Sequence, residues 1–242
     1  MNVFLELRHI SKSYGEGSTL VHALTDVDLR VDTGELVAVM GPSGSGKSTL
    51  LTIAGTLESP TAGDVVIDAM AVLAMSANDQ ARLRRRSIGY VFQSFNLLAG
   101  LTASENVALP LELDGVRARD AQRMARRVLD ELGLGDRASH YPDDLSGGES
   151  QRVAIARAVV GERRLLLADE PTGALDTVNG EAVMRLLRAT YERGVAAVVV
   201  THDAQLAAWA DRTVFVRDGR IADRTSPRSG PEPLLEPKSP SL

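Results

Sequence analysis

Near its start the chain alternates apolar and polar positions, which is the pattern of strands that bury one face. The alternation runs through Val3–Leu7 and returns through Val27–Val31, and a loop that contains Gly15 and Gly17 separates the two stretches. Roughly the first 35 residues are therefore predicted to form β structure.

Short apolar runs without polar interruption follow, and such runs are typical of strands buried on both faces. Leu36–Met40 is one of them; it leads into a glycine-rich loop, after which a helix is predicted from Lys47 to about Leu57. Val65–Ile67 predicts a further strand. A buried strand, a tight loop and a helix thus follow one another directly.

The middle of the chain, from Ser94 to Val160, is predicted to be mostly helical. Met124, Val128 and Leu132 recur there at helical spacing, with arginines on the other faces. Gly133 directly follows this stripe and predicts the end of its helix.

Strands and helices alternate after this region. Leu165–Ala168 predicts a strand, Glu181–Tyr191 a helix and Val195–Val200 another strand, which together indicate a parallel sheet covered by helices. The segment from Thr213 to Ile221 predicts a closing hairpin that turns at an Asp-Gly pair. Thr225–Leu242 is rich in Ser, Pro and Gly and predicts a disordered tail.

Composition narrows the choice of function. The 242 residues are 44% hydrophobic, enough for a sizeable core, and the formal net charge of −5 argues against a general nucleic-acid binder. Cysteine is absent, which excludes disulfides and Cys-ligated zinc. We expect neither a signal peptide nor a transmembrane helix, because charges interrupt the first apolar stretch and the other runs are short. A role at a membrane would therefore depend on a partner.

The loop after Leu36–Met40 carries a phosphate-binding pattern, G-x-x-x-x-G-K-[ST], between a strand and a helix. Glycines let the backbone curl around phosphate oxygens, while backbone amides and the helix N-terminus attract the anion. Lys47 is expected to reach the β- and γ-phosphates, and the Ser48 hydroxyl to bind Mg²⁺. The predicted nucleotide-binding residues here are Gly41, Pro42, Ser43, Gly44, Ser45, Gly46, Lys47, Ser48 and Thr49. This loop alone leaves kinases, GTPases and molecular motors open.

A second phosphate-binding pattern precedes a helix predicted from about Ser150 to Val160. It contains Ser146, Gly147, Gly148 and Glu149, and it resembles the signature sequence of the ABC ATPase family. In that family these residues contact the γ-phosphate of an ATP molecule held by the opposite subunit. Ser146 and Glu149 also form a capping-box pattern, and both interpretations can hold together. Many members have Gln in place of Glu149, which is a mild departure.

The same resemblance implies roles for residues elsewhere in the chain. Asp169 would approach Mg²⁺, and Glu170 would act as general base for the attacking water. His202 resembles the switch histidine, which contacts the γ-phosphate and orients the base. Gln93 resembles the glutamine that senses Mg²⁺ and the γ-phosphate, and Asp176 resembles the D-loop residue at the dimer interface.

The implied site has a catalytic, a metal-binding and an adenine-binding part. Tyr14 resembles the aromatic residue that stacks on adenine. The residues implied in catalysis are Glu170, His202, Gln93 and Lys47, and the implied Mg²⁺ ligands are Ser48, Gln93 and Asp169.

Family membership implies an α/β fold of the P-loop NTPase type for residues 1–224. Its parts are a mainly parallel core sheet, an N-terminal antiparallel β subdomain and an inserted helical subdomain at about residues 94–160. It also implies an ATP-sandwich dimer with a second copy of the chain. Several stretches, among them Phe92–Leu98 and Glu105–Leu111, resemble the macrolide-export and lipoprotein-release group (MacB- and LolD-like), to which the cell-division ATPase FtsE is close.

That group implies a separate permease with four membrane spans, and a peripheral position on the cytoplasmic face of the cell membrane. Two alternatives remain open at this point. One is a regulatory, FtsE-like ATPase that drives an extracytoplasmic process without transport, and the other is a soluble ABC ATPase unrelated to transport. The arginine-rich runs Arg82–Arg86 and Arg117–Arg127 lack interleaved aromatic residues, so we interpret them as solvated or partner-facing helix surface, with no nucleic acid bound.

Overall fold

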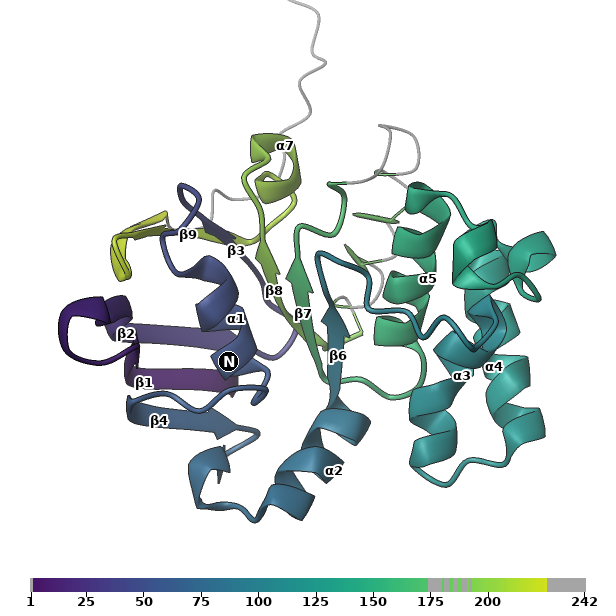
Figure 1. Ribbon diagram of the computed structural model, residues 1–242, viewed down its shortest axis with the longest axis horizontal. Coiled ribbons are helices and arrows are strands. Elements are labelled where there is room, and N and C mark those ends of the chain that lie inside the picture. The colour runs from purple at the N-terminus through teal and green to yellow at the C-terminus, as the bar shows by residue number, and fades with distance from the viewer. Residues whose placement is uncertain are drawn as a thin grey trace, which may run out of the picture.

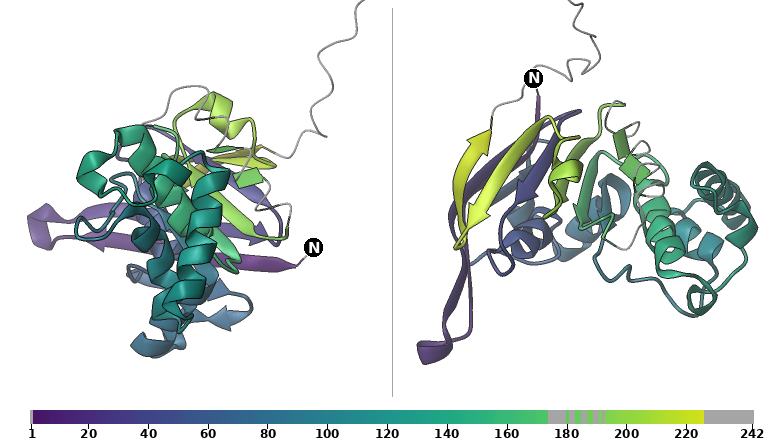
Figure 2. Two further views of the ribbon diagram at one scale, coloured as in Figure 1. Left: turned by 90° about the vertical axis from the view of Figure 1, so that its right-hand side faces the viewer. Right: turned by 90° about the horizontal axis from the view of Figure 1, so that it is seen from above.

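Two sheets and a group of helices make up the computed structural model, which describes residues 2–173, 180, 183–184, 187–188, 191 and 193–225 (Figure 1). One sheet has four strands in the order β2-β1-β4-β5, and the other has six in the order β10-β9-β3-β8-β7-β6. Helices α3, α4 and α5 lie together at one end of the molecule, away from β1 and β2 (Figures 1 and 2).

The four-stranded sheet is antiparallel in every pairing. Its strands are β1 (Val3–Tyr14), β2 (Val21–Asp32), β4 (Ala62–Ile67) and β5 (Met70–Ala71). The predicted alternation holds on β2, where Val27, Leu29 and Val31 are buried while Arg30 between them is exposed. This sheet is the predicted N-terminal β part of the fold.

The six-stranded sheet is parallel except at one edge. Its strands are β3 (Leu36–Met40), β6 (Ile88–Val91), β7 (Leu165–Asp169), β8 (Ala196–Val200), β9 (Arg212–Arg217) and β10 (Arg220–Thr225). Every residue of β7 and β8 is buried, as expected for central strands of a covered parallel sheet. The antiparallel β9–β10 pair forms the predicted hairpin.

Helix α1 joins the two sheets. The α-helices are α1 (Lys47–Ala54), α2 (Ala77–Ser87), α3 (Ala103–Leu113), α4 (Ala118–Glu131), α5 (Gly147–Val159) and α7 (Ala204–Ala207). Helix α1 contacts β1 and β2 on one side and β7 and β8 on the other. One continuous apolar cluster therefore contains Leu50, Leu51 and Ile53 together with residues of both sheets. The loop before α1 is fixed by this packing.

The buried stripe of α4 differs from the predicted one. Met124 is 38% exposed, whereas Ala121, Ala125 and Leu129 are fully buried, and the stripe continues to Leu132. These residues belong to an apolar cluster shared with α3 and α5. The small alanine side chains let α4 lie close to its neighbours, so the helix buries the stripe next to the one predicted.

Several helices and strands begin or end at residues other than the predicted ones. Helix α1 ends at Ala54 and not at Leu57, and α5 begins at Gly147, about a turn before its predicted start. Strand β10 extends to Thr225, so the strand includes the first residue of the predicted tail. Residues 226–242 and most of the predicted helix at 181–191 lie outside the described residues. No helix in the described part of the chain is long and apolar enough to span a membrane.

Candidate functional site

The glycine-rich loop leaves the end of β3 and enters α1 in a conformation that requires glycine. Gly46 has a φ of 102°, and a Cβ atom there would lie 2.4 Å from the carbonyl oxygen of Ala23. A Cβ atom on Gly41 would lie 2.1 Å from the carbonyl oxygen of Val216. Gly44, at the turn of the loop, has a φ of 77° and open space around it. The loop is thus packed closely against β2 and β9 while its turn stays accessible.

Lys47 folds back over this loop. Its Nζ donates hydrogen bonds to the carbonyl oxygens of Gly41 and Pro42, both at 2.8 Å. The hydroxyl of Ser45 is buried and has no hydrogen-bond partner among the described residues. An ammonium held by two neutral carbonyls can exchange them for phosphate oxygens without breaking an ion pair. The loop therefore presents the charge, the amides and the hydroxyls that a triphosphate requires.

Ser48 and Asp169 meet at the edge of the six-stranded sheet. Asp169 is the last residue of β7, its carboxylate is buried, and the Ser48 side chain lies close enough to lower its pKa. Burial raises the pKa of Asp169 and the neighbouring Glu170 carboxylate adds to this, while the Ser48 hydrogen bond and the Lys47 charge oppose it. A hydroxyl beside a carboxylate offers hard oxygen donors, the type that suits Mg²⁺. Ser48 and Asp169, two of the three predicted ligands, therefore fit the ion, and the part of Gln93 stays a prediction.

Glu170 and His202 form a pair directly beyond Asp169. The Nδ1 atom of His202 lies 2.7 Å from Oε1 of Glu170. The hydrogen bond and charge of Glu170 raise the pKa of His202. The side chain of Glu170 is 16% exposed and that of His202 is 77% exposed, so the carboxylate is shielded and the imidazole reaches outward. Glu170 has a φ of 48°, a strained value for a residue with a Cβ atom.

The backbone and one unpredicted residue hold Glu170 in this position. Its amide donates to the carbonyl oxygen of Val200 at 2.9 Å, and the hydroxyl of Thr201 lies 3.4 Å from its Oε2 atom. Thr201 is fully buried. Sequence reasoning missed Thr201, although a polar residue between a buried strand and a candidate catalytic histidine was a usable signal.

The signature residues cap α5. The Ser146 hydroxyl accepts from the amide of Glu149 at 3.3 Å, and the Glu149 carboxylate accepts from the amide of Ser146 at 2.8 Å. The predicted capping box is therefore present. Glu149 also pairs with Arg137 at 2.8 Å, and its hydrogen bonds to Ser146 and Arg137 lower its pKa to about 2. A Cβ atom on Gly147 would have no neighbouring atom within 4 Å, which leaves space beside the helix N-terminus.

Tyr14 is the last residue of β1 and contacts the segment that follows α1. Its hydroxyl donates to Glu58 at 2.7 Å, and the Lys12 ammonium lies 5.1 Å from its ring centroid. The residue is 40% exposed. The stacking of this partly exposed ring on adenine stays a prediction.

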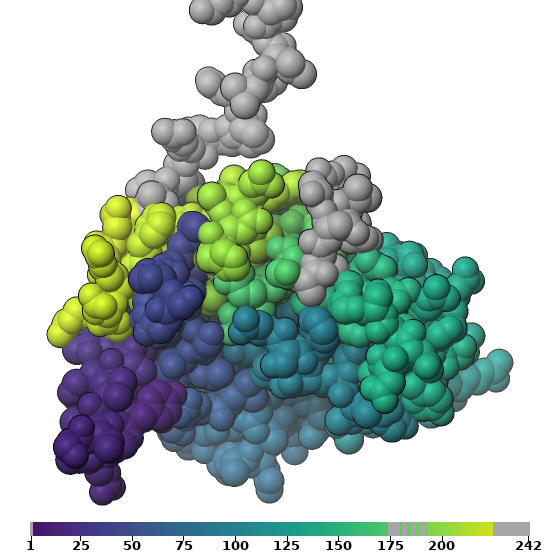
Figure 3. Space-filling view, turned by 45° about the horizontal axis from the view of Figure 1, so that its top comes forward, coloured from purple at the N-terminus to yellow at the C-terminus, as the bar shows by residue number. Residues whose placement is uncertain are grey.

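The structure brings together part of the predicted site. Lys47, Ser48, Asp169, Glu170 and His202 lie at the edge where β3, β7 and β8 end. No hydrogen bond or ion pair found among the described residues joins Ser146–Glu149 to this group. In Figure 3 the dark blue region that includes the phosphate loop and the green helical region occupy different parts of the visible face.

Two further predicted residues lie apart from this group or cannot be placed. Gln93 is exposed in the segment that follows β6. Asp176 lies outside the described residues.

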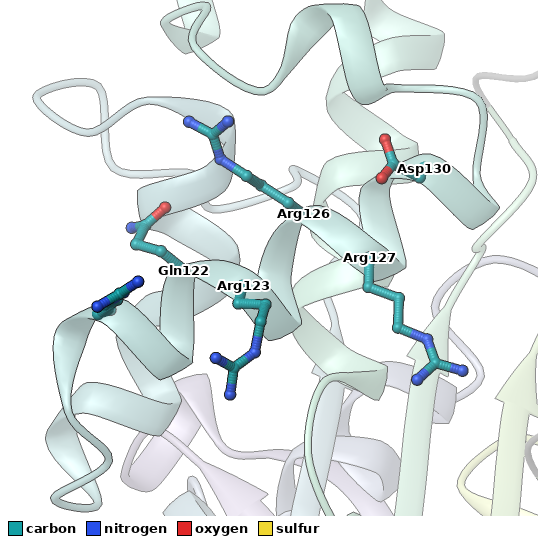
Figure 4. A pocket seen from close by; sticks show the side chains of 6 residues that line it. Gln122, Arg123, Arg126, Arg127 and Asp130 are labelled. Carbon is teal, nitrogen blue, oxygen red and sulfur yellow. The ribbon is translucent and has the colours of Figure 1, made fainter.

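The arginine side chains of α4 point in different directions along the helix surface. Figure 4 shows Arg126 pointing away from Arg123 and Arg127, so the guanidinium groups do not converge. Arg123 pairs with Asp120 at 2.8 Å, and Arg127 pairs with Glu131 at 3.3 Å. The shallow surface pocket here is lined by Arg119, Gln122, Arg123, Arg126, Arg127 and Asp130. These arginines lie on an exposed helix surface, and their interpretation as a solvated or partner-facing surface stays a prediction.

The mainly parallel sheet, the glycine loop between β3 and α1 and the acidic end of β7 define a P-loop nucleoside triphosphatase fold. The family described as "ABC transporter" matches residues 24–173. The chain is 47% identical over 217 residues to "Uncharacterized ABC transporter ATP-binding protein YvrO" of Bacillus subtilis, covering 90% of this chain and 95% of that protein. The chain therefore belongs to the ABC transporter family, as one of its ATPase cassettes.

Longer relatives match equally well. The chain is 45% identical over 235 residues to "Macrolide export ATP-binding/permease protein MacB" of Brucella melitensis, which covers 96% of this chain but 36% of that protein. The chain thus spans little more than a third of this relative.

A solved structure shares the fold. It is described as "Dimeric structure of a post-hydrolysis state of the ATP-binding cassette MJ0796 bound to ADP and Pi". The TM-score is 0.89 at 41% identity, and the match covers 93% of this chain and 100% of that one. The predicted fold class and family are confirmed by these likenesses, while the roles of individual site residues stay predictions.

Proposed function

We propose that this chain binds Mg²⁺-ATP and hydrolyses it between two copies of itself, and that it thereby powers a separate membrane permease. The observation that carries the proposal is the convergence of Lys47, Ser48, Asp169, Glu170 and His202 at one sheet edge. This set provides a phosphate-binding cation, hard oxygen ligands and a carboxylate base in one place.

The phosphate loop holds the nucleotide. The amides of residues 41–48 and the N-terminus of α1 bind the phosphate oxygens, and Lys47 exchanges its two carbonyl contacts for the β- and γ-phosphates. Tyr14 stacks on the adenine. Ser48, Asp169 and Gln93 would hold Mg²⁺, which when bound neutralises charge on the β- and γ-phosphates.

Glu170 and His202 carry out the proton chemistry. The Glu170 carboxylate accepts a proton from the water that attacks the γ-phosphorus, and the bond from that phosphorus to the β–γ bridging oxygen breaks. His202 donates a hydrogen bond to Glu170 and keeps the carboxylate in one orientation. The strained backbone of Glu170, tied to Val200 and next to Thr201, fixes the base before ATP arrives.

The signature residues complete the site of the other copy. Ser146, Gly147, Gly148 and Glu149 lie on the helical part of the molecule, where free amides at the start of α5 attract an anion. Two copies facing each other place each signature on the γ-phosphate held by the opposite phosphate loop, with Asp176 at the interface. A two-fold axis follows from this exchange. ATP then joins the copies, and hydrolysis removes the contact that held them.

The proposal that ATP hydrolysis is coupled to transport is based on the MacB relatives. MacB proteins carry an ATP-binding and a permease part in one chain by name, and this chain aligns to about a third of their length. We infer that this chain serves a permease of the same type, with four spans, from the cytoplasmic face of the membrane. A permease that transmits motion to an extracytoplasmic process without transport would use the same cassette. Co-purification with a membrane protein distinguishes both from a soluble ABC ATPase.

The assembly step can be tested with a substitution that the isolated chain tolerates. Gly147→Asp has room for its side chain, and an acidic residue in the first turn of a helix is favourable for folding. In an assembled site the same carboxylate would face the γ-phosphate and repel it. In a Glu170→Gln background we expect ATP without Mg²⁺ to produce a dimer in size-exclusion chromatography, and added Gly147→Asp to abolish it.

The same chromatography with ADP and with no nucleotide serves as the control, and both samples should elute as monomers. Ala118→Asp is the matched charge control, because Ala118 is exposed and is the first residue of α4, as Gly147 is of α5. A dimer that forms equally in all nucleotide states, or that persists with Gly147→Asp, contradicts the sandwich.

A further inference from the structure

The segment after Gln93 is held by a residue of the signature helix. Arg157 lies on α5, about three turns beyond Ser146. Its Nη1 atom donates to the carbonyl oxygen of Asn96 at 2.5 Å, and its Nη2 atom donates to that of Phe95 at 2.7 Å. One guanidinium group thus joins the helix that carries the signature to the chain two residues beyond Gln93.

The receiving turn has an unusual backbone. Phe95 has a φ of 62° and Asn96 a φ of 48°, both in the left-handed region. Two consecutive residues of this kind are strained unless the surroundings stabilise them. Arg157 supplies that stabilisation, because its two hydrogen bonds go to the neutral carbonyls of this same turn. Burial lowers the pKa of Arg157, as expected for a cation withdrawn from water.

The other end of the same segment is also fixed. Asn106 on α3 is fully buried. Its side-chain oxygen accepts from the amide of Leu98 at 2.8 Å, and its side-chain nitrogen donates to the carbonyl oxygens of Leu98, Leu101 and Thr102 at 3.1, 2.9 and 3.0 Å. The segment Phe95–Thr102, called here the clamped segment, is therefore held at its start by α5 and at its end by α3.

Both anchors lie on helices that pack against each other. Residues of α3 and α5, among them Val107 and Val153, share an apolar cluster, and Leu97 of the clamped segment packs against it. Helix α5 also packs against the sheet, through Ile155 and Ala158. The chain up to Val91 belongs instead to strand β6 of the sheet. Gln93 therefore lies in the short stretch between strand β6 and the clamped segment.

We propose that Arg157 is a positioning residue for Gln93, which ties the clamped segment to the signature helix so that Gln93 and the signature move into the nucleotide site together. The inference rests on the proposed function insofar as Gln93 contacts the Mg²⁺ and γ-phosphate region. Lys47 and the phosphate loop bind ATP in another part of the molecule, so losing the tie should affect turnover and spare affinity.

Arg157→Lys tests this tie while retaining the charge. A lysine ammonium is a point donor and cannot reproduce the planar fork that reaches two successive carbonyls. We expect kcat for ATP hydrolysis to fall about 10-fold, because small displacements of positioning groups have effects of that size. KM for ATP should change by less than about 2-fold, since ground-state binding is unaffected. The matched control is Arg123→Lys on the exposed face of α4, which should retain the kcat of the original chain.

A second measurement does not depend on how the variant folds. In the Glu170→Gln chain, amide hydrogen exchange of the clamped segment and of the first half of α5 should slow together when ATP is added. In Arg157→Lys, ATP should protect α5 while the clamped segment keeps exchanging. An unchanged kcat in Arg157→Lys, or protection of α5 without the clamped segment in the Glu170→Gln chain, overturns the inference. Absence of ATP hydrolysis in the unaltered chain would instead refute the proposed function itself.

Discussion

Glu170→Gln is expected to bind ATP normally and to lose about 10²- to 10⁴-fold in the rate of hydrolysis, the usual contribution of a general base. The amide has the shape of the carboxylate, so it can keep the contacts with His202 and Thr201, but it cannot accept a proton from water. Single-turnover measurements of phosphate release, with the affinity for ATP determined separately, check both parts.

The matched control for this prediction is Glu162→Gln. Glu162 is exposed in the loop that precedes β7, so its charge should have no part in the reaction. Hydrolysis by Glu170→Gln at a rate near that of the control would remove Glu170 from the mechanism.

Lys47→Ala is expected to weaken ATP binding by about 10- to 100-fold, which corresponds to the loss of charge-assisted hydrogen bonds of roughly 1.5–3 kcal/mol. The loop carbonyls of Gly41 and Pro42, which Lys47 now satisfies, would face the phosphates instead and repel them. Isothermal titration calorimetry with ATP in the absence of Mg²⁺ measures the change.

Lys47→Arg separates charge from shape at the same position. A compact ammonium fits between two carbonyls at 2.8 Å, whereas a planar guanidinium is larger and needs a wider site. We therefore expect Lys47→Arg to bind ATP more weakly than the unaltered chain despite its charge. If Lys47→Ala binds with undiminished affinity, the loop does not hold the phosphates.

Three strands of the parallel sheet, β3, β7 and β8, could be predicted from the sequence almost to the residue, whereas β6 was not predicted. Leu36–Met40 coincides with β3, because an uninterrupted apolar run that ends at a glycine loop leaves few alternatives. The buried face of α4 could not be predicted in the same way. Its core stripe consists largely of alanines, Ala121 and Ala125, which carry a weaker signal than the exposed Met124.

The candidate site likewise contains residues that the sequence predicts and residues that it does not. Glu170 and His202 follow from their places in motifs at strand ends, and the structure adds their 2.7 Å contact. Thr201, Arg157 and Asn106 were missed because their importance lies in buried contacts with distant backbone, and such contacts have no periodicity. One feature of the sequence could have indicated the role of Asn106, because it is a polar residue among apolar ones on the inner face of α3.

The most direct test of the central claim is complementation between two inactive variants. Gly147→Asp alone lacks a working signature, and Glu170→Gln alone lacks a base, so neither homodimer should hydrolyse ATP appreciably. In a mixed dimer the phosphate loop and base of the Gly147→Asp copy face the intact signature of the Glu170→Gln copy, which restores one composite site. Because Gly147→Asp weakens pairing, an equal mixture should recover measurable activity, up to about a quarter of the original per chain, the value for random pairing. Activity of the mixture that merely equals the average of the separate variants would contradict a site shared between two copies.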